Sequence, residues 1–107
     1  MTMNHKKSKA TDISAKTRKI VEQRDNGQCI ICGNWGRPNA HYICRNDGGL
    51  GIPENIVTLC DRCHYEYDHG NNPETYEEKI RNYLDHYYTN WPSINLVYDK
   101  WAFLKGE

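Results

Sequence analysis

The sequence predicts a small α+β domain stabilised by a metal site, and three observations support that prediction. The chain has 107 residues, of which only 37% are hydrophobic, so its apolar core will be modest. Short β-branched runs alternate with segments of helical periodicity. Four of the five cysteines form two CxxC pairs, Cys29–Cys32 and Cys60–Cys63. A domain of this size commonly needs a metal or disulfide staple to be stable.

A first helix is expected from Ser14 to Asp25. Asp12 or Ser14 is the predicted N-cap, because a side-chain oxygen there can accept from a free N–H group of the first turn. Asn26-Gly27 is the predicted C-terminal stop, since both residue types tolerate the left-handed conformation that ends helices.

Two short strands and two further helices follow. Residues 39–44 and the β-branched run 56–59 have the composition of strands. A second helix should begin near Asp61 and end at Gly70. A third has apolar residues at helical spacing and should be capped by Asn72, with Pro73 at its first position. The expected elements are strands 39–44 and 56–59 and helices 14–25, 61–70 and 74–88.

The chain is expected to form one domain with a flexible basic N-terminal arm. The arm covers residues 1–12 and the domain 13–107, with a core motif at 29–69 and a C-terminal helical extension at 73–107. The formal net charge of zero argues against a strongly basic nucleic-acid binder. Basic residues nevertheless cluster near the N-terminus, as a phosphate contact or as a solvated terminus. They include Lys16, Arg18 and Lys19.

The two CxxC pairs predict a structural zinc site. Two such turns bring four sulfurs together in the tetrahedron that Zn²⁺ prefers, with no open position for chemistry. The alternative is a pair of disulfides, but the polar N-terminal residues contain no signal-peptide pattern. A reducing cytoplasm is therefore the expected location, and no stretch has the length of a membrane span. Cys44 is left over and is expected to be a buried or half-buried thiol.

Further motifs between and after the cysteine pairs resemble the HNH family of nucleases. The order is Ala40-His41-Tyr42-Ile43, then Gly48-Gly49, then Glu54-Asn55-Ile56, then Cys63-His64. The family pattern is CxxC, Asp-His-Ile-Ile, Gly-Gly, Glu-Asn-Leu and CxxCH. This resemblance covers residues 29–69 and is similar to small phage and prophage HNH proteins. It implies a ββα-metal fold that holds one divalent cation between a hairpin and a helix.

The resemblance also implies roles for individual residues. His41 matches the general base, because it precedes Gly48 by seven residues as in the family. Asn55 matches the residue that orients the loop and holds the base. His64 matches the metal ligand on the closing helix, and Asp68, four residues on, can share that metal. His69 competes with Asp68 as the second ligand and ranks below it.

One position departs from the family pattern. The residue before the base is normally Asp or His and binds the metal, but here it is Ala40. Either His64, Asp68, water and substrate phosphate hold the metal, or the alignment shifts by one. In the shifted alignment His41 is the ligand and Tyr42 takes the base position, where its pKa of about 10 makes it a poor base. A third reading is an inactive domain.

The predicted function is a metal-dependent HNH endonuclease that hydrolyses DNA phosphodiesters. The catalytic ion would be Mg²⁺, Mn²⁺, Ni²⁺ or Zn²⁺, because oxygen and imidazole ligands suit several metals. Arg37 and Arg45 are candidate phosphate clamps, together with the basic residues of the first helix. Other candidate partners are a second copy of the chain and phage packaging or replication proteins. The alternative function is an inactive zinc-ribbon module that binds nucleic acid or protein.

Overall fold

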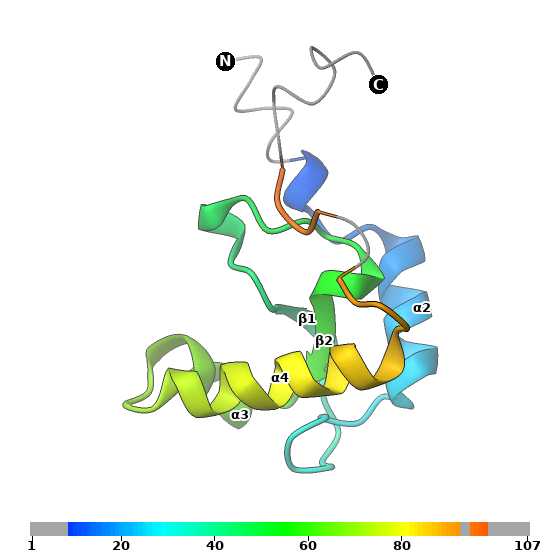
Figure 1. Cartoon of the computed structure of the whole chain (residues 1–107). Helices are drawn as coiled ribbons and strands as arrows, with labels where there is room; N and C mark the ends of the chain where they lie inside the picture. Colours follow the sequence, from blue (N-terminus) through cyan, green and yellow to red (C-terminus); the bar gives the residue numbers. More distant parts are fainter. Residues whose placement is uncertain (1–8, 93–94, 99–107) are drawn as a thin grey trace, which may run out of the picture.

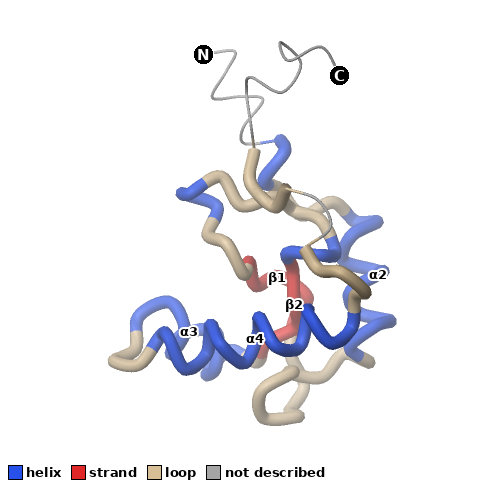
Figure 2. Tube along the Cα trace, viewed as in Figure 1, coloured by secondary structure: helices blue, strands red, loops and turns tan. Residues whose placement is uncertain are grey.

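The chain folds as a small α+β domain around a two-stranded antiparallel sheet (Figures 1 and 2). The computed structural model describes residues 9–92 and 95–98. No helix in this described part is long and apolar enough to cross a membrane. The elements in chain order are α2 (Ala15–Asp25), β1 (Arg37–His41), η1 (Arg45–Asp47), η2 (Pro53–Asn55), β2 (Ile56–Leu59), α3 (Asp61–His69) and α4 (Pro73–Tyr87).

The first helix ends where the sequence predicts. Ser14 is the N-cap of α2, and its side chain accepts from the backbone N–H of Thr17 at 3.1 Å. Asn26 and Gly27 both have positive φ angles, of 59° and 67°, and so turn the chain out of the helix. The starts of α3 and α4 are also as predicted within one residue, although the Asn72 side chain makes no capping bond.

The sheet pairs β1 with β2, with Ala40 opposite Val57 and His41 opposite Ile56. One extra residue on β1 forms a bulge between Arg37 and Ala40. All four residues of β2 are buried, which accounts for a run without polar–apolar alternation. Figure 2 shows β2 between α2 and α4.

The main apolar cluster joins the sheet to the two C-terminal helices. Ile80 and Leu84 of α4 are fully buried against Val57 and Leu59. The other buried members are Ala40 and three of the cysteines, Cys29, Cys60 and Cys63. The apolar core and the cysteine cluster are therefore continuous.

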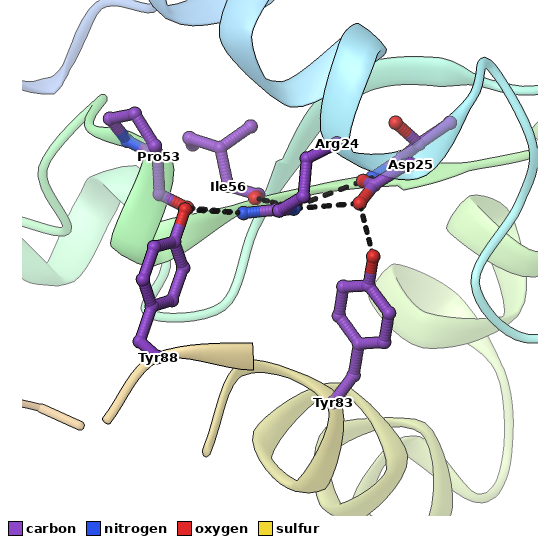
Figure 3. Close-up of polar contacts among 7 residues, drawn as sticks. Arg24, Asp25, Pro53, Ile56, Tyr83 and Tyr88 are labelled. Carbon is purple, nitrogen blue, oxygen red and sulfur yellow. Dashed lines mark hydrogen bonds and ion pairs between the residues drawn. The ribbon is translucent and has the colours of Figure 1, made fainter. Parts of the chain in front are cut away.

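A buried ion pair, Arg24 and Asp25, lies along the edge of β2 that is not paired with β1 (Figure 3). The side chains of Arg24 and Asp25 are 2% and 0% exposed, and two hydrogen bonds of 2.7 and 3.0 Å join them. Burial alone acts to lower the pKa of Arg24, but the hydrogen bonds and charge of Asp25 more than offset it and raise that pKa. Arg24 is therefore a permanent buried cation whose charge is matched by one carboxylate.

This pair satisfies backbone groups of β2 that face away from β1. Arg24 donates to the carbonyl of Ile56 at 2.7 Å and to that of Pro53 at 2.8 Å. Asp25 accepts from the backbone N–H of Thr58 at 3.0 Å. An unpaired sheet edge buried without such partners would be costly. The pair satisfies this edge together with the backbone N–H of Ile30, which donates to the carbonyl of Thr58 at 3.0 Å.

Tyrosines of α4 and the residue after it complete the network. Tyr83 donates to Asp25, and Arg24 donates to the Tyr88 hydroxyl at 3.1 Å. The guanidinium carbon also lies 5.4 Å from the ring centroid of Tyr83 and 5.5 Å from that of Tyr87. Tyr83 and Tyr87 of α4 thus serve intramolecular packing around Arg24.

Three expectations about the chain need correction. Residues 1–8 lie outside the described part, but Ala10, Thr11 and Asp12 contact the domain and are not a free arm. The first strand is 37–41 and not 39–44, because the Asn55 side chain takes the backbone N–H and carbonyl of Ile43. Cys44 therefore lies in a loop and is exposed, not buried.

The C-terminal extension is helical only as far as Tyr87. Beyond it the described residues 88–92 and 95–98 contain no helix, although they do pack back on the domain as expected. Trp91 donates to the carbonyl of Glu54 at 2.9 Å, and Val97 pairs with Gly49 in a β-bridge. These contacts to other segments replace the bonds that would continue the helix.

Replacing Arg24 should cost more stability than any exposed charge of the same helix. In Arg24→Ala, Asp25 keeps its burial but loses its cation, and loss of one member of a buried pair costs roughly 3–5 kcal/mol. Arg18→Ala, at an exposed position of α2, is the control and should change stability by less than about 0.5 kcal/mol. Urea unfolding of both variants measures the difference. Equal stabilities would contradict the role given to the pair.

Candidate functional site

Four cysteine sulfurs converge at one end of the sheet. Their Sγ atoms all lie within 4.8 Å of one another, and those of Cys32 and Cys60 are 3.6 Å apart. A tetrahedral zinc with Zn–S bonds of about 2.3 Å places its sulfurs about 3.8 Å apart. The cluster therefore fits a four-coordinate thiophilic metal, as the sequence predicts, and it can hold zinc.

Local backbone structure positions both pairs. In the first, the N–H of Cys29 donates to Asn34 at 2.7 Å and that of Gly33 to Cys29 at 2.9 Å, which closes a tight turn. In the second, Cys60 is the N-cap of α3, and its sulfur accepts from the N–H of Cys63 at 3.4 Å. A helix N-terminus favours negative charge, so this position suits a thiolate.

Electrostatics differ among the four thiols. A backbone N–H at Asn34 lowers the pKa of Cys32 to about 6, whereas burial raises the pKa of Cys63. Four thiolates around a divalent ion leave two net negative charges. Arg62, within the second CxxC, lies beside them, and their charge raises its pKa, Cys63 contributing most. Sequence reasoning missed this compensating cation, although its position between the cysteines was a signal.

A separate pocket of about 840 Å³ lies at the other end of the sheet. The end of β1, the following loop, α3 and the start of α4 form its wall. His41, His64 and Asp68 all line it, so the structure brings together three residues that the sequence assigned to one site. His69, the competing ligand, lines it as well.

His41 stands in the pocket with one nitrogen engaged. Its Nε2 lies 2.9 Å from the backbone carbonyl oxygen of Thr11. A carbonyl can only accept, so Nε2 carries the proton and the neutral ring presents Nδ1 as its basic nitrogen. Burial lowers the pKa of His41, and the charges of Arg45 and His64 act in the same direction. The imidazole is therefore neutral, and able to accept a proton, at neutral pH.

His64 and Asp68 lie one turn apart on α3. Their Nε2 and Oδ2 atoms are 3.3 Å apart, and both side chains are partly exposed, at 29% and 50%. These two donors could share one ion. No third ligand side chain joins them: among the described residues, the four cysteines are the group of three or more side chains that could hold a metal ion. Water or substrate oxygens would have to complete the coordination, as is common for Mg²⁺.

Asn55 holds the loop beside His41. It is fully buried, accepts from the N–H of Ile43 at 2.9 Å and donates to the carbonyls of Ile43 and Leu50 at 3.2 and 2.8 Å. Its backbone carbonyl accepts from Tyr42 at 2.8 Å. The loop-orienting role expected of Asn55 agrees with these bonds. Within the described contacts, however, it acts on the residues after His41 and not on the imidazole itself.

Ala40 and Tyr42 flank His41 in the sequence; Tyr42 lines the pocket with His41, whereas Ala40 does not. Ala40 is fully buried in the apolar cluster, so nothing at this position can bind a metal. Tyr42 packs edge-on against Trp91 with ring centroids 5.4 Å apart, and its carbonyl accepts from Tyr67 at 2.7 Å. These contacts favour His41, and not Tyr42, as the base of this pocket.

Of the predicted phosphate-binding residues, Arg45 lines the pocket and the others do not. Arg45 lines the pocket and is paired with Asp12. Arg37 is exposed and lies 3.8 Å from Asp61, and it is not part of the pocket wall. The basic residues of α2 are exposed and also lie outside that wall; they are Lys16, Arg18 and Lys19.

The fold and the cysteine cluster define a small α+β domain with four thiols that can hold a metal ion. No protein-family model and no solved structure matches the chain. It is 32% identical over 59 residues to anaredoxin from Nostoc sp. strain PCC 7120, a match that covers 51% of this chain and 75% of that protein. The chain therefore belongs to the same family as anaredoxin.

Loss of one cysteine ligand should unfold the domain. Structural zinc contributes roughly 10–16 kcal/mol of apparent folding free energy in small domains. Cys60→Ser should therefore abolish stoichiometric metal and the cooperative thermal transition. Cys44→Ser, at the exposed fifth cysteine, is the matched control and should preserve both. Elemental analysis and circular dichroism melting measure the two properties, and a cooperative metal-free Cys60→Ser protein would contradict the structural role.

His41 should titrate below the usual value for histidine. The folded protein binds this proton more weakly than the unfolded chain, because burial opposes the charged ring. The resulting contribution to stability is complete above the unfolded pKa of about 6.5 and declines as the pH falls below it. An NMR titration of the imidazole, assigned by the signal missing in His41→Ala, gives the midpoint. A midpoint at or above 6.5 would contradict this assignment.

Proposed function

We propose that this protein is a metal-dependent endonuclease of the HNH type that hydrolyses phosphodiester bonds in DNA. The observation that carries the proposal is the convergence of His41 with His64 and Asp68 on one pocket. These residues come from β1 and α3, more than twenty positions apart in the sequence. A base and a pair of metal ligands around one cavity are the parts that metal-assisted hydrolysis needs.

The order of the elements supports the same proposal. An antiparallel strand pair is followed directly by a helix, with the base at the end of β1 and the ligand pair on α3. This is the arrangement expected of a ββα-metal site. The four-cysteine cluster lies apart from the pocket wall and would serve as scaffold.

Each pocket residue has a chemical role in this proposal. His41 accepts a proton from the attacking water at Nδ1, while the carbonyl of Thr11 holds the other nitrogen. His64 and Asp68 would hold the divalent ion, which when bound would polarise the phosphate and stabilise the leaving oxygen. Arg45 is positioned at the pocket wall to contact a phosphate oxygen once it leaves Asp12.

The choice of ion and partner follows from these residues. One imidazole and one carboxylate suit Mg²⁺, Mn²⁺, Ni²⁺ or Zn²⁺, with water at the remaining positions. DNA is the proposed substrate. A single pocket cleaves one strand at a time, so double-strand cleavage would need a second copy of the chain or two successive cleavage events. Phage packaging or replication proteins and a cytoplasmic location stay predictions from the sequence.

A second candidate is an electron-transfer role for the cysteine cluster. The relative is named as a redoxin, and a tetrahedron of four thiolates accommodates iron as well as zinc. In that case the cluster, and not the pocket, would be the functional centre. The metal that the protein acquires therefore distinguishes the candidates: zinc supports a scaffold, and iron with reversible visible absorption supports electron transfer.

A cleavage assay on supercoiled plasmid tests the nuclease proposal. Zinc-loaded protein should nick the plasmid with Mg²⁺, Mn²⁺ or Ni²⁺ and should be inactive in EDTA. His41→Ala should lower the rate by at least about a hundredfold, since general base catalysis contributes roughly 10²–10⁴-fold. His86→Ala is the matched control, because His86 lies on α4 outside the pocket wall and should leave cleavage unchanged.

Three results would overturn the proposal or part of it. Folded, metal-loaded protein that cleaves with none of these ions would favour an inactive binding module, with Ala40 as the reason. Cleavage that survives unchanged in His41→Ala would instead place the base elsewhere. Iron at the cysteine cluster, with no cleavage, would favour the electron-transfer candidate.

A further inference from the structure

The N-terminal segment 10–12, here called the strap, contacts His41 of the proposed active site. Thr11 is only 2% exposed, although it lies close to the chain terminus. Its carbonyl oxygen is the atom that accepts from Nε2 of His41 at 2.9 Å. The strap therefore contacts the proposed base directly, from a part of the chain outside the resemblance at residues 29–69.

Neighbouring contacts hold the strap against the loop that follows β1. The backbone N–H of Gly51 donates to the carbonyl of Ala10 at 3.1 Å, on one side of Thr11. On the other side, the carboxylate of Asp12 pairs with Arg45 of η1. The Thr11 carbonyl is thus fixed by bonds at both flanking residues.

Gly51 is also needed for this close approach. A Cβ atom built at Gly51 would overlap the carbonyl oxygen of Asp12 and would lie 3.1 Å from the backbone nitrogen of Ile13. No positive φ is involved at Gly51, so the requirement is one of space. Any larger residue at this position would push the strap away from the loop and from His41.

We propose that the strap is a positioning element for His41: it fixes the Nε2–H tautomer and turns Nδ1 toward the pocket. Without an acceptor at Nε2 the ring could place its proton on either nitrogen and could rotate about its side chain. A misplaced base loses rate steeply, because proton transfer requires hydrogen-bond geometry. The catalytic consequence rests on the proposed function, whereas the tautomer of His41 does not.

The tautomer can be read independently of activity. Two-bond ¹H–¹⁵N correlation spectra of the full chain at pH 8 should show His41 wholly in the Nε2–H form. Gly51→Ala, which displaces Asp12, and Asp12→Lys, which repels Arg45, should both give a mixture of tautomers. Each should also lower kcat by roughly tenfold or more. KM should change less than about twofold in Gly51→Ala, whereas Asp12→Lys also releases Arg45 and adds a cation, so only kcat and the tautomer are compared for that variant.

Matched controls separate positioning from general loss of stability. Ile80→Val removes one methyl group from the core far from the strap and costs roughly 0.5–1.5 kcal/mol. Asp85→Lys makes the same charge change as Asp12→Lys at an exposed site on α4. Both controls should keep the single tautomer and the wild-type kcat.

The outcomes distinguish this proposal from the proposed function. A mixed or Nδ1–H tautomer in the wild type would overturn the strap, as would an unchanged tautomer in both strap variants. A single Nε2–H form that is lost in the variants, in a protein that cleaves no DNA, would support the positioning and remove the nuclease. Normal cleavage by variants with a mixed tautomer would overturn the catalytic consequence.

Discussion

The buried pair of Arg24 and Asp25 is the interaction on which the rest of the structure depends. A two-stranded sheet is too small to be stable alone, and one edge of β2 would be buried with unpaired backbone groups. Arg24 and Asp25 satisfy that edge from the end of α2 (Figure 3). Through Tyr83 and Tyr88 the same two side chains also fasten α4. One ion pair thus joins a helix on either side of the sheet.

The cysteine cluster and this ion pair stabilise different parts of the same sheet. The cluster ties the turn after α2 to the start of α3, whereas the pair ties α2 to β2 and α4. Together they fix the direction in which α3 leaves β2. That direction decides whether His64 and Asp68 face the same cavity as His41, so the scaffold determines the geometry of the pocket.

The pocket itself is assembled from segments held together by hydrogen bonds as well as by packing. Asn55 fixes the loop after β1, and the strap fixes the imidazole of His41 from behind. Ala40, directly before His41, is buried in the apolar cluster and offers no ligand atom. In the proposed nuclease, protein ligands to the ion are therefore few, and substrate oxygens would contribute to its binding. With few protein ligands to the ion, the proposed reaction depends more strongly on the position of His41, and hence on the strap.

The sequence by itself determined the elements and the cysteine cluster. Periodicity, caps and CxxC spacing are local signals, so α2, α3, α4 and β2 are where they were expected, and the four thiols do converge. Only the tertiary structure decided how Arg24 and Asp25 are used, because two charged residues at a helix end look the same whether they are buried or solvated. It also decided that residues 10–12 cover His41 and that the first strand ends at 41. These outcomes rest on hydrogen bonds between residues far apart in the chain, which no local pattern encodes.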